Sequence, residues 1–378
     1  MNYVKLKDVC TINMGQSPSS DSYNENGHGV PFFQGNADFG ERYPVTRKWC
    51  SAPTKMVAPE DILISVRAPI GAMNYAKEEC CIGRGLAALT PNREKVAPEY
   101  IFWLLKGKNE ELNCKGTGST FKAIGRNILE ETLVPNISLE KQTECAIILE
   151  KTYRVILSRK QQLQKLDELV KARFVEMFGD PVQNSLKWVT KSLLEMGYCK
   201  NGVNFHSGDS GIEIHCLGVG DFKDYSVVDG TDYLPTISLS EEPPEESMLQ
   251  DGDIVFVRSN GNKALVGRCL VVYPHNTPTT YSGFCIRYRL TSNEVNTSYL
   301  LRVLKADSMR KKMIGRGANI QNLNQKTLAT LNIPIPPMEL QEQFAEFVNQ
   351  TDKSKVVVQK ALDEAQTLFD SLMQEYFG

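Results

Sequence analysis

The sequence of 378 residues lacks several features that would assign it to a common protein class. No apolar run approaches the 18 or more residues of a membrane-spanning helix, and the start has no hydrophobic core of a secretory signal. The ten cysteines include no Cys-x-x-Cys pair, and the four histidines show no ligand spacing with each other or with cysteine. We therefore expect a cytoplasmic protein with reduced thiols and no metal ion or cofactor.

Excess charge of one sign is also missing, because 43 Lys and Arg residues stand against 45 Asp and Glu residues. This balance argues against a generic basic nucleic-acid binder. A DNA-binding face would have to be a local arrangement of basic residues, because phosphate contacts need local rather than net positive charge.

The motifs of common catalytic sites are absent as well. There is no Gly-x-x-x-x-Gly-Lys-Ser/Thr phosphate loop, no Gly-x-Gly-x-x-Gly and no Gly-x-Ser-x-Gly elbow. The sequence also lacks the Glu-x-Lys of metal-dependent nucleases and the Asn/Asp-Pro-Pro-Tyr/Phe signature of amino-methyltransferases. We therefore predict that this chain has no catalytic residue.

What the sequence does contain is an internal repeat with a constant offset of 199 residues, which matches residues 116–179 to residues 315–378 without a gap. Two copies are too few, and their period too long, for a solenoid. The chain is a tandem duplication in which each copy should be a domain with an appendage. The residues that recur are Gly116, Gly118, Leu129, Pro135, Glu140, Gln142, Leu163, Leu169, Glu176, Phe178 and Gly179.

Each copy ends in a segment that predicts one long helix. The first starts at Ser138, a suitable N-cap, and is stopped by Gly179-Asp180-Pro181; the second follows Pro337 and runs to Gly378. Apolar positions three and four apart predict a coiled-coil seam between the two helices, whereas a helix lying on its own domain is the alternative. The seam positions are Leu149, Thr152, Ile156, Arg159, Leu163, Leu166, Val170, Arg173 and Met177, then Val348, Thr351, Lys355, Val358, Leu362, Ala365, Phe369, Leu372 and Tyr376.

The remainder of each copy has the pattern of a mixed α/β domain. Asp61–Arg67 and Asp253–Arg258 predict buried strands, and Pro98–Lys106 and Thr297–Lys305 predict short helices. The loops differ between the copies, which suits two domains that recognise different things, because binding residues tend to lie on loops. The predicted boundaries are 1–138 and 181–337 for the domains, and 139–180 and 338–378 for the helices.

Short motifs recur in the same order in both copies. Leu133–Pro135 and Ile333–Pro337 lead into Glu-x-Gln and a long helix, and Gly118–Ile124 and Phe178–Pro181 complete the pattern. In this order the motifs resemble the DNA-specificity subunit of type I restriction-modification enzymes, over the whole chain. The resemblance implies a pseudo-twofold α/β fold in which two target-recognition domains are separated by two long antiparallel helices.

The resemblance also implies a function. Each domain would read one half of a bipartite double-stranded DNA target, while the helices fix the gap between the halves. The helices would also dock two methyltransferase subunits, which carry the S-adenosylmethionine chemistry, and motor-nuclease subunits would add ATP-dependent cleavage. This division of labour would explain why catalytic motifs are missing from the chain.

Sequence discrimination requires polar side chains at base edges, with Lys and backbone amides on phosphates. In the first domain the candidates are Arg42, Arg47, Lys48, Arg67, Arg84, Lys122 and Arg126. In the second domain they are Arg258, Asn260, Lys263, Arg268, Arg316, Asn319 and Gln321. On the helices we expect four outward apolar side chains to await a partner, namely Ile147, Ile148, Phe344 and Phe347.

Two alternatives remain open from the sequence. The first is a DNA-modifying enzyme whose motif has diverged, and it predicts activity of the purified chain without partners. The second is a structural adaptor that binds only proteins, and it predicts no DNA contact in an assembled complex.

Overall fold

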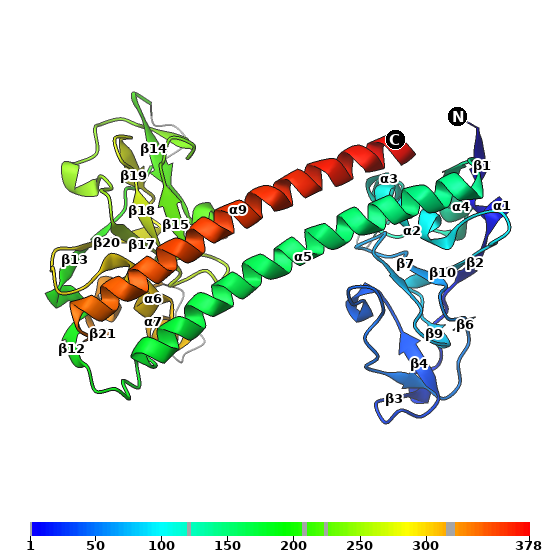
Figure 1. The fold of residues 1–378 in the computed structure, drawn as a ribbon, viewed down its shortest axis with the longest axis horizontal. Helices are drawn as coiled ribbons and strands as arrows, with labels where there is room; N and C mark the ends of the chain where they lie inside the picture. The colour runs from blue at the N-terminus through cyan, green and yellow to red at the C-terminus, as the bar shows by residue number, and fades with distance from the viewer. Residues whose placement is uncertain (1, 119–121, 206–209, 223–225, 315–321) are drawn as a thin grey trace. The chain divides into compact units, whose positions relative to one another are not determined.

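The computed structural model describes residues 2–118, 122–205, 210–222, 226–314 and 322–378. The chain divides into two compact units (Figure 1). Unit 1 is Met1–Gln161 with Gln359–Gly378, and unit 2 is Gln162–Val358. Each unit contains an α/β domain together with a part of both long helices, α5 (Leu139–Phe178) and α9 (Met338–Phe377).

The domain of unit 1 is built on two sheets with the strand orders β2-β10-β7-β8 and β3-β5-β4-β9-β6, and β1 pairs with β11 beside them. All pairs are antiparallel except β4 with β9. The strands are β1 (Tyr3–Lys5), β2 (Cys10–Met14), β3 (Tyr23–Asn24), β4 (Val30–Phe33), β5 (Trp49–Cys50), β6 (Met56–Val57), β7 (Ile62–Ser65), β8 (Met73–Tyr75), β9 (Cys80–Ile82), β10 (Leu86–Pro91) and β11 (Leu133–Pro135). The helices are α1 (Leu6–Val9), η1 (Ser20–Ser22), η2 (Asn36–Asp38), α2 (Pro98–Gly107), α3 (Asn109–Cys114) and α4 (Arg126–Glu130).

The domain of unit 2 repeats this plan with the strand orders β13-β20-β17-β18-β15, β16-β14-β19 and β12-β21. Its strands are β12 (Val189–Ser192), β13 (Gly197–Asn201), β14 (Ile212–Leu217), β15 (Val227–Asp229), β16 (Thr236–Leu239), β17 (Asp253–Val257), β18 (Cys269–Tyr273), β19 (Thr279–Tyr281), β20 (Cys285–Leu290) and β21 (Asn332–Ile335). Its helices are η3 (Leu193–Glu195), η4 (Val219–Phe222), η5 (Glu245–Ser247), α6 (Thr297–Lys305), α7 (Asp307–Ile314) and α8 (Gln325–Ala329).

The apolar runs of the sequence form the centres of these sheets. β7 and β17 are buried along their whole length, as the sequence predicts, because both faces of each strand are covered. In β20 the side chains alternate, so that Ile286 and Tyr288 face the core that contains α6, while Cys285 faces a second core. The predicted short helices are also confirmed, as α2 and α6.

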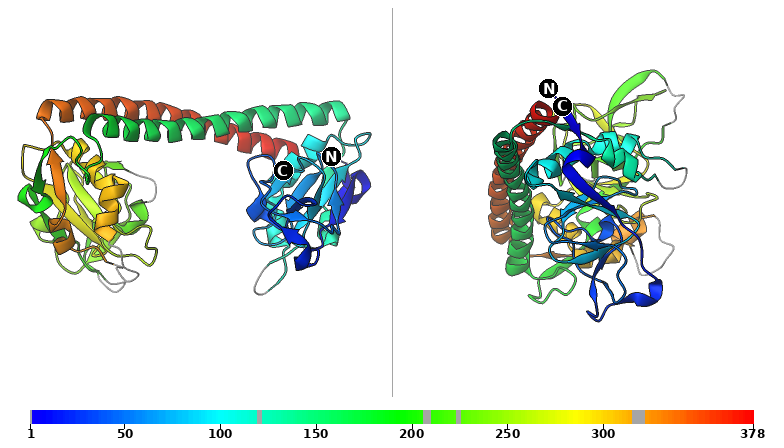
Figure 2. Two further views of the ribbon diagram at one scale, coloured as in Figure 1. Left: turned by 90° about the horizontal axis from the view of Figure 1, so that it is seen from below. Right: turned by 90° about the vertical axis from the view of Figure 1, so that its right-hand side faces the viewer.

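The two long helices pack together along the predicted seam, as the ribbons of Figure 2 show. All eighteen predicted seam positions are buried or half-buried. The seam also contains charged residues, and ion pairs neutralise one of them. In unit 2, Lys355 of α9 forms ion pairs with Asp167 of α5 (2.8 Å) and with Asp352 (2.9 Å). The coiled-coil prediction is therefore confirmed.

The last phenylalanine of each helix anchors it to a domain. In unit 2, the ring of Phe178 at the end of α5 lies 4.8 Å from the ring of Tyr299 in α6. In unit 1, Phe377 at the end of α9 lies 5.1 Å from Tyr100 in α2. Each helix thus begins after the domain of its own copy and ends on the domain of the other copy, which a helix lying only on its own domain would not do.

A buried glutamine fixes the start of each long helix, and it explains one of the repeated residues. The side chain of Gln341 accepts a hydrogen bond from the N–H of Asn296 (2.9 Å) and donates to the carbonyls of Glu294 (3.0 Å) and Pro336 (2.8 Å). Gln142 does the same in unit 1, with the N–H of Ala97 and the carbonyl of Ile137 both at 2.9 Å. The Glu-x-Gln motif therefore joins the helix to the loop before α2 or α6.

We expect Gln341→Leu to destabilise this junction by about 2–4 kcal/mol, because three buried backbone groups lose their partner at once. Hydrogen exchange of the first amides of α6 in the full-length protein measures the effect. Gln343→Leu, a change at an exposed position two residues away, is the matched control. Equal exchange rates in the two variants would show that the glutamine has no such role.

Candidate DNA-recognition surfaces

Each unit has a hollow at the same place in its domain, where β7 or β17 ends. The hollow of unit 1 has a volume of about 220 Å³ and that of unit 2 about 420 Å³. The first is lined by Gln34, Gly35, Asn36, Arg67, Ala68, Arg84 and Gly85. The second is lined by Val219, Ser259, Asn260, Gly261, Phe284 and Asn322.

The backbone contacts at the rims show that these hollows are equivalent. In each unit the rim is held by one N–H···O=C hydrogen bond and one isolated β-bridge. In unit 1 the N–H of Val66 donates to the carbonyl of Gly85 (2.9 Å), and the bridge joins Arg67 to Ala123. In unit 2 the N–H of Arg258 donates to the carbonyl of Phe284 (2.8 Å), and the bridge joins Ser259 to Asn322. The match aligns Arg67 with Ser259 and Gly85 with Phe284. It also aligns Arg258 with Val66, so the two arginines that end the predicted strands are not counterparts.

Three of the basic residues predicted in the first domain gather around the hollow of unit 1. Arg67 and Arg84 line it, and their side chains are exposed. Neither guanidinium makes a hydrogen bond or ion pair with any residue that the structure describes. Lys122 lies beside them, because its carbonyl accepts the N–H of Ala68 at 3.0 Å. These side chains are free to meet an anion or a base edge.

The other four basic residues of the first domain lie elsewhere. Arg42 forms an ion pair with Glu150 of α5 at 3.2 Å, and its guanidinium lies 5.2 Å from the ring centre of Tyr75. Arg126 is exposed but paired with Glu130 at 2.7 Å. Arg47 donates to the carbonyl of Ala37 in η2, and Lys48 beside it is exposed. Arg42 therefore connects the domain to the helix pair.

The predicted residues of the second domain are divided similarly. Asn260 lines the hollow, whereas the half-buried Arg258 donates to the carbonyl of Gly283 at 3.4 Å. Arg268 donates to the carbonyls of Ala264 (3.2 Å) and Phe222 (3.4 Å), and Lys263 is exposed. Three candidates lie outside the described residues, namely Arg316, Asn319 and Gln321.

The sequence did not single out Ser259, Phe284 and Asn322, which complete the hollow of unit 2. Phe284 is 62% exposed in a turn that leads directly into the buried strand β20. A phenylalanine after Gly283, just before an apolar run, is a usable signal only when the turn is known.

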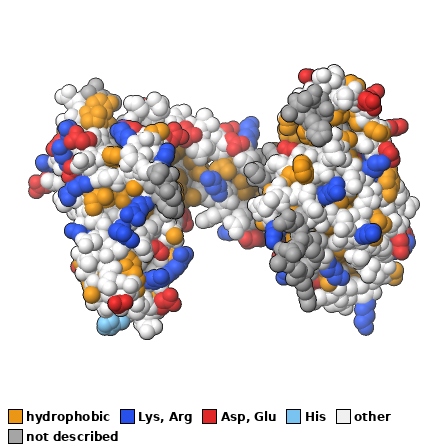
Figure 3. All heavy atoms as spheres, turned by 180° about the vertical axis from the view of Figure 1, so that it is seen from behind, with side chains coloured by type: hydrophobic (Ala, Val, Ile, Leu, Met, Phe, Trp, Pro, Cys, Tyr) orange, Lys and Arg blue, Asp and Glu red, His pale blue; other side chains and the backbone are white. Residues whose placement is uncertain are grey.

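Figure 3 shows basic side chains in the middle of one face of unit 1, the unit with the histidine in pale blue, and acidic ones nearer its edge.

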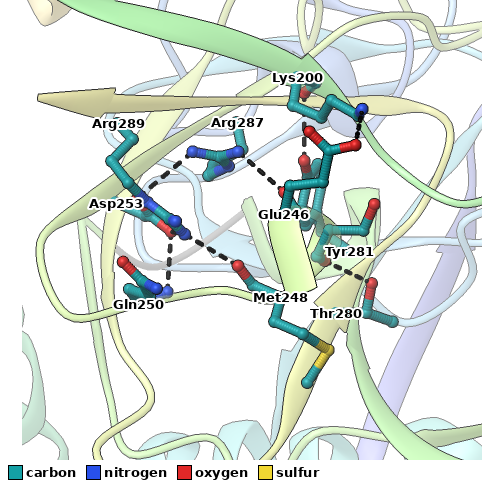
Figure 4. Close-up of polar contacts among 10 residues, drawn as sticks. Lys200, Glu246, Met248, Gln250, Asp253, Thr280, Tyr281, Arg287 and Arg289 are labelled. Carbon is teal, nitrogen blue, oxygen red and sulfur yellow. Dashed lines mark hydrogen bonds and ion pairs between the residues drawn. The ribbon is translucent and has the colours of Figure 1, made fainter. Parts of the chain in front are cut away.

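A buried charged cluster joins β17 to β20 at the start of β17, the end away from the second hollow (Figure 4). Asp253 of β17 accepts two hydrogen bonds from Arg289 of β20, at 2.8 and 2.7 Å, and these bonds raise the pKa of the arginine. Arg287 is fully buried and donates to the carbonyl of Glu246 in η5 at 2.9 Å. The two arginines thereby hold the acidic loop before β17, because Arg289 also donates to the carbonyl of Met248 (2.9 Å).

The predicted outward residues of the long helices are only partly exposed. Ile147 and Ile148 are 48% and 39% exposed. The prediction for Phe344 is wrong, because the first turns of α9 are covered both by the domain and by the end of α5; its ring is fully buried, 5.5 Å from that of Phe174. Phe347 is half-buried against the same core.

Two further leucines of the long helices are exposed. Leu169 of α5 and Leu368 of α9 are 49% and 54% exposed, and they are 199 residues apart. The signal was present, since both belong to the repeat yet lie outside the seam. The same apolar feature therefore occurs on both helices.

All ten cysteines are free thiols. No group of three or more His, Cys, Asp or Glu side chains among the described residues could hold a metal ion. None of the helices in the described ranges is long and apolar enough to cross a membrane.

The comparison with protein families places the chain in a known group. The type I restriction modification DNA specificity domain matches residues 1–168 and 224–365. The chain belongs to this family. It is therefore a DNA specificity subunit of a type I restriction-modification system, and subunits of this kind are non-catalytic.

Individual relatives agree with this assignment. The StySPI specificity subunit of Salmonella potsdam is 24% identical over 85% of this chain and 74% of its own length. The EcoKI specificity subunit of Escherichia coli is 22% identical over the same shares. The MjaX specificity subunit of Methanocaldococcus jannaschii is 42% identical, but the match spans only 42% of this chain and 38% of that protein.

Solved structures share the fold of this specificity subunit. The S subunit of a type I restriction-modification system from M. genitalium aligns with a TM-score of 0.60 and 15% identity, over 100% of this chain and 96% of that one. A chain from a study of complex assembly of the type I system aligns with a TM-score of 0.59 and 17% identity, over 100% and 97%. Two α/β domains with two long helices packed together are thus the architecture of this family.

Proposed function

We propose that each domain of this specificity subunit reads one half of a bipartite DNA target, and that α5 and α9 set the gap between the halves. The observation that carries the proposal is the pair of equivalent hollows, which share a backbone frame but not their side chains. Two different half-sites require one scaffold with two sets of reading groups. The recognition domains would be residues 1–138 and 181–337, and the spacer helices 139–180 and 338–378.

The basic residues around each hollow would divide the work of DNA binding. Arg67 and Arg84 have free guanidinium groups at the hollow and would contact bases, whereas exposed cations farther out, such as Lys48 and Lys263, would meet phosphates. The near-neutral overall charge is compatible with this division, because the cations are concentrated locally. Of the other predicted residues, Arg47, Lys122, Arg258 and Arg268 would contact phosphates farther from the hollows, whereas Arg126 is paired with Glu130 and would take no part. Arg316, Asn319 and Gln321 remain predicted DNA contacts.

The outward faces of the helices would dock the rest of the assembly. Leu169 and Leu368 place the same exposed apolar group on both helices, at repeat positions. A repeated surface suits two copies of one partner, and two methyltransferase subunits are that partner in our proposal. Ile147 and Ile148 enlarge the apolar area on α5. Motor-nuclease subunits would join the same complex, which would act in the cytoplasm.

An exchange of domains tests this function. Residues 1–138 are replaced by those of another family member, and the modified DNA motif is read by methylome sequencing of cells that also hold the methyltransferase subunit. We expect one half-site to change completely, while the other half-site and the gap stay the same. The reciprocal exchange of residues 181–337 should change only the other half. A single exchange that altered both halves would contradict the proposal.

A further inference from the structure

The two hollows differ in charge as well as in shape. Two exposed arginines, Arg67 and Arg84, line the hollow of unit 1. Among the residues that the structure describes, those that line the hollow of unit 2 are all uncharged. At the matched rim positions, Arg67 is replaced by Ser259, and Gly85 is replaced by Phe284, whose ring is 62% exposed. Both hollows contain carboxamides, Gln34 and Asn36 in unit 1 and Asn260 and Asn322 in unit 2. Unit 1 adds two guanidinium groups to them, whereas unit 2 adds an exposed aromatic ring.

We propose that the hollow of unit 1 reads guanine and that the hollow of unit 2 reads an A·T base pair. The inference rests on the proposed function, in which each domain reads one half of the target. Guanine presents two acceptors in the major groove, N7 and O6, whereas adenine presents one acceptor and one donor. A guanidinium has only donors, so Arg67 and Arg84 complement guanine and leave the amino group of adenine without a partner.

The carboxamide of Asn322 has the complementary chemistry for adenine. Its side chain is exposed and makes no hydrogen bond with another residue in the described part of the chain, so both its oxygen and its amino group can bond. An asparagine in this state binds the N6 amino group and the N7 of adenine together. The bridge between Ser259 and Asn322 fixes the backbone at this position, which places the carboxamide at the rim.

Two neighbours of Asn322 fit the thymine of the same base pair. The side-chain oxygen of Asn260 already accepts the N–H of Asn262 at 2.8 Å, so its amino group remains as a donor for O4 of thymine. The exposed ring of Phe284 offers the apolar surface that a thymine methyl group contacts. An unpaired base stacked on Phe284 is a different use of the ring, and it would not depend on that methyl group.

Base analogues that change single atoms test both assignments on the full-length chain assembled with its methyltransferase subunits. Duplexes with the cognate motif carry 7-deazaguanine at each guanine in turn, or deoxyuridine at each thymidine, and binding is measured at one salt concentration. We expect one 7-deazaguanine in the half-site of unit 1 to weaken binding about 10-fold, because an acceptor of a bidentate contact is lost. We expect one deoxyuridine in the half-site of unit 2 to weaken it about 4-fold, because one methyl contact is lost.

Variants assign each effect to a residue. The 7-deazaguanine effect should disappear in Arg67→Ala or in Arg84→Ala, and it should persist in Arg126→Ala, whose exposed guanidinium is paired with Glu130 outside the hollow. The deoxyuridine effect should disappear in Phe284→Ala. The complex with Asn322→Ala should bind a duplex in which another purine replaces one adenine of the same half-site as tightly as it binds the cognate duplex.

The outcomes separate this inference from the proposed function. If both arginine variants kept their sensitivity to 7-deazaguanine, or if Phe284→Ala kept its sensitivity to deoxyuridine, the assignment of bases would be overturned while bipartite recognition stood. The assignment of bases would also be overturned if the wild-type complex bound every analogue duplex as tightly as the cognate duplex. For deoxyuridine, that is the result expected if an unpaired base stacks on Phe284. A complex that selects no sequence at all would instead contradict the proposed function.

Discussion

Replacement of Asp253 by alanine is expected to lower the free energy of unfolding of unit 2 by about 3–5 kcal/mol, because a buried cation would lose its counter-charge. Asp253 is 1% exposed, and it accepts both hydrogen bonds of the Arg289 fork as well as the N–H of Gln250 at 2.8 Å. Arg287 is fully buried, with its Nη1 4.0 Å from the same carboxylate. In Asp253→Ala the fully buried Arg287 cannot reach water without opening the sheet.

Unit 1 provides the matched control for this substitution. Asp61 occupies the position of Asp253, but the strand pairing places Ala88 where unit 2 has Arg287. Burial raises the pKa of the Asp61 carboxyl, and the carboxyl accepts the N–H of Ala58 at 3.2 Å. The carboxyl also has a hydrogen bond with the side chain of Thr90, but no buried cation depends on it. Asp61→Ala should therefore cost only about 1–2 kcal/mol, the value of two hydrogen bonds.

Hydrogen exchange of the amides of β17 and β20, compared with those of β7 and β10, measures the two effects in full-length protein. A second variant, in which Asp253→Ala is combined with Arg287→Met and Arg289→Met, should recover much of the loss because no charge is left in the core. Equal protection of β17 in wild type and Asp253→Ala would contradict this account of the cluster.

The fold was largely predictable because its signals are periodic and local. The offset of 199 residues and the three-four spacing of the seam identify the duplication and the helix pair without knowledge of any contact. The strands β7 and β17 could be predicted because uninterrupted apolar runs of this length are typical of strands buried on both faces.

The site was less predictable because its residues are brought together by contacts between segments that are distant in the sequence. Asn322 lies beside Phe284 and Ser259 only because a β-bridge joins segments that are far apart in the sequence. The match of Arg67 with Ser259 is also hidden in the sequence, because the two predicted strands differ by one residue in where their arginine lies. Arg42 looked like a DNA contact, yet it pairs with Glu150, 108 residues away. Phe344 looked like an outward residue, because helical periodicity does not reveal how many faces of a helix are covered.

The second large effect is expected from a matched lengthening of both helices. Residues 155–161 of α5 and 352–358 of α9 are each duplicated, so that seven residues are added to both helices at the points where the chain passes from one compact unit to the other. A seven-residue insertion keeps the coiled-coil period, so the seam residues on either side stay in register. The helices lengthen by about 10 Å, at 1.5 Å per residue, which corresponds to as many as about three base pairs of DNA.

The insertion leaves both recognition domains unchanged, because every residue that lines a hollow lies outside the duplicated segments. The same seven residues added to α5 alone provide the control, since they put the two halves of the seam out of register. That variant should lose modification activity rather than acquire a new spacing.

Methylome sequencing of cells that hold the matched-insertion variant and the methyltransferase subunit measures the central claim directly. The account predicts that both half-sites keep every base and that the gap between them grows by one to about three base pairs. A motif with an unchanged gap, or with altered half-sites, would show that the helices do not set the distance between two independent reading domains.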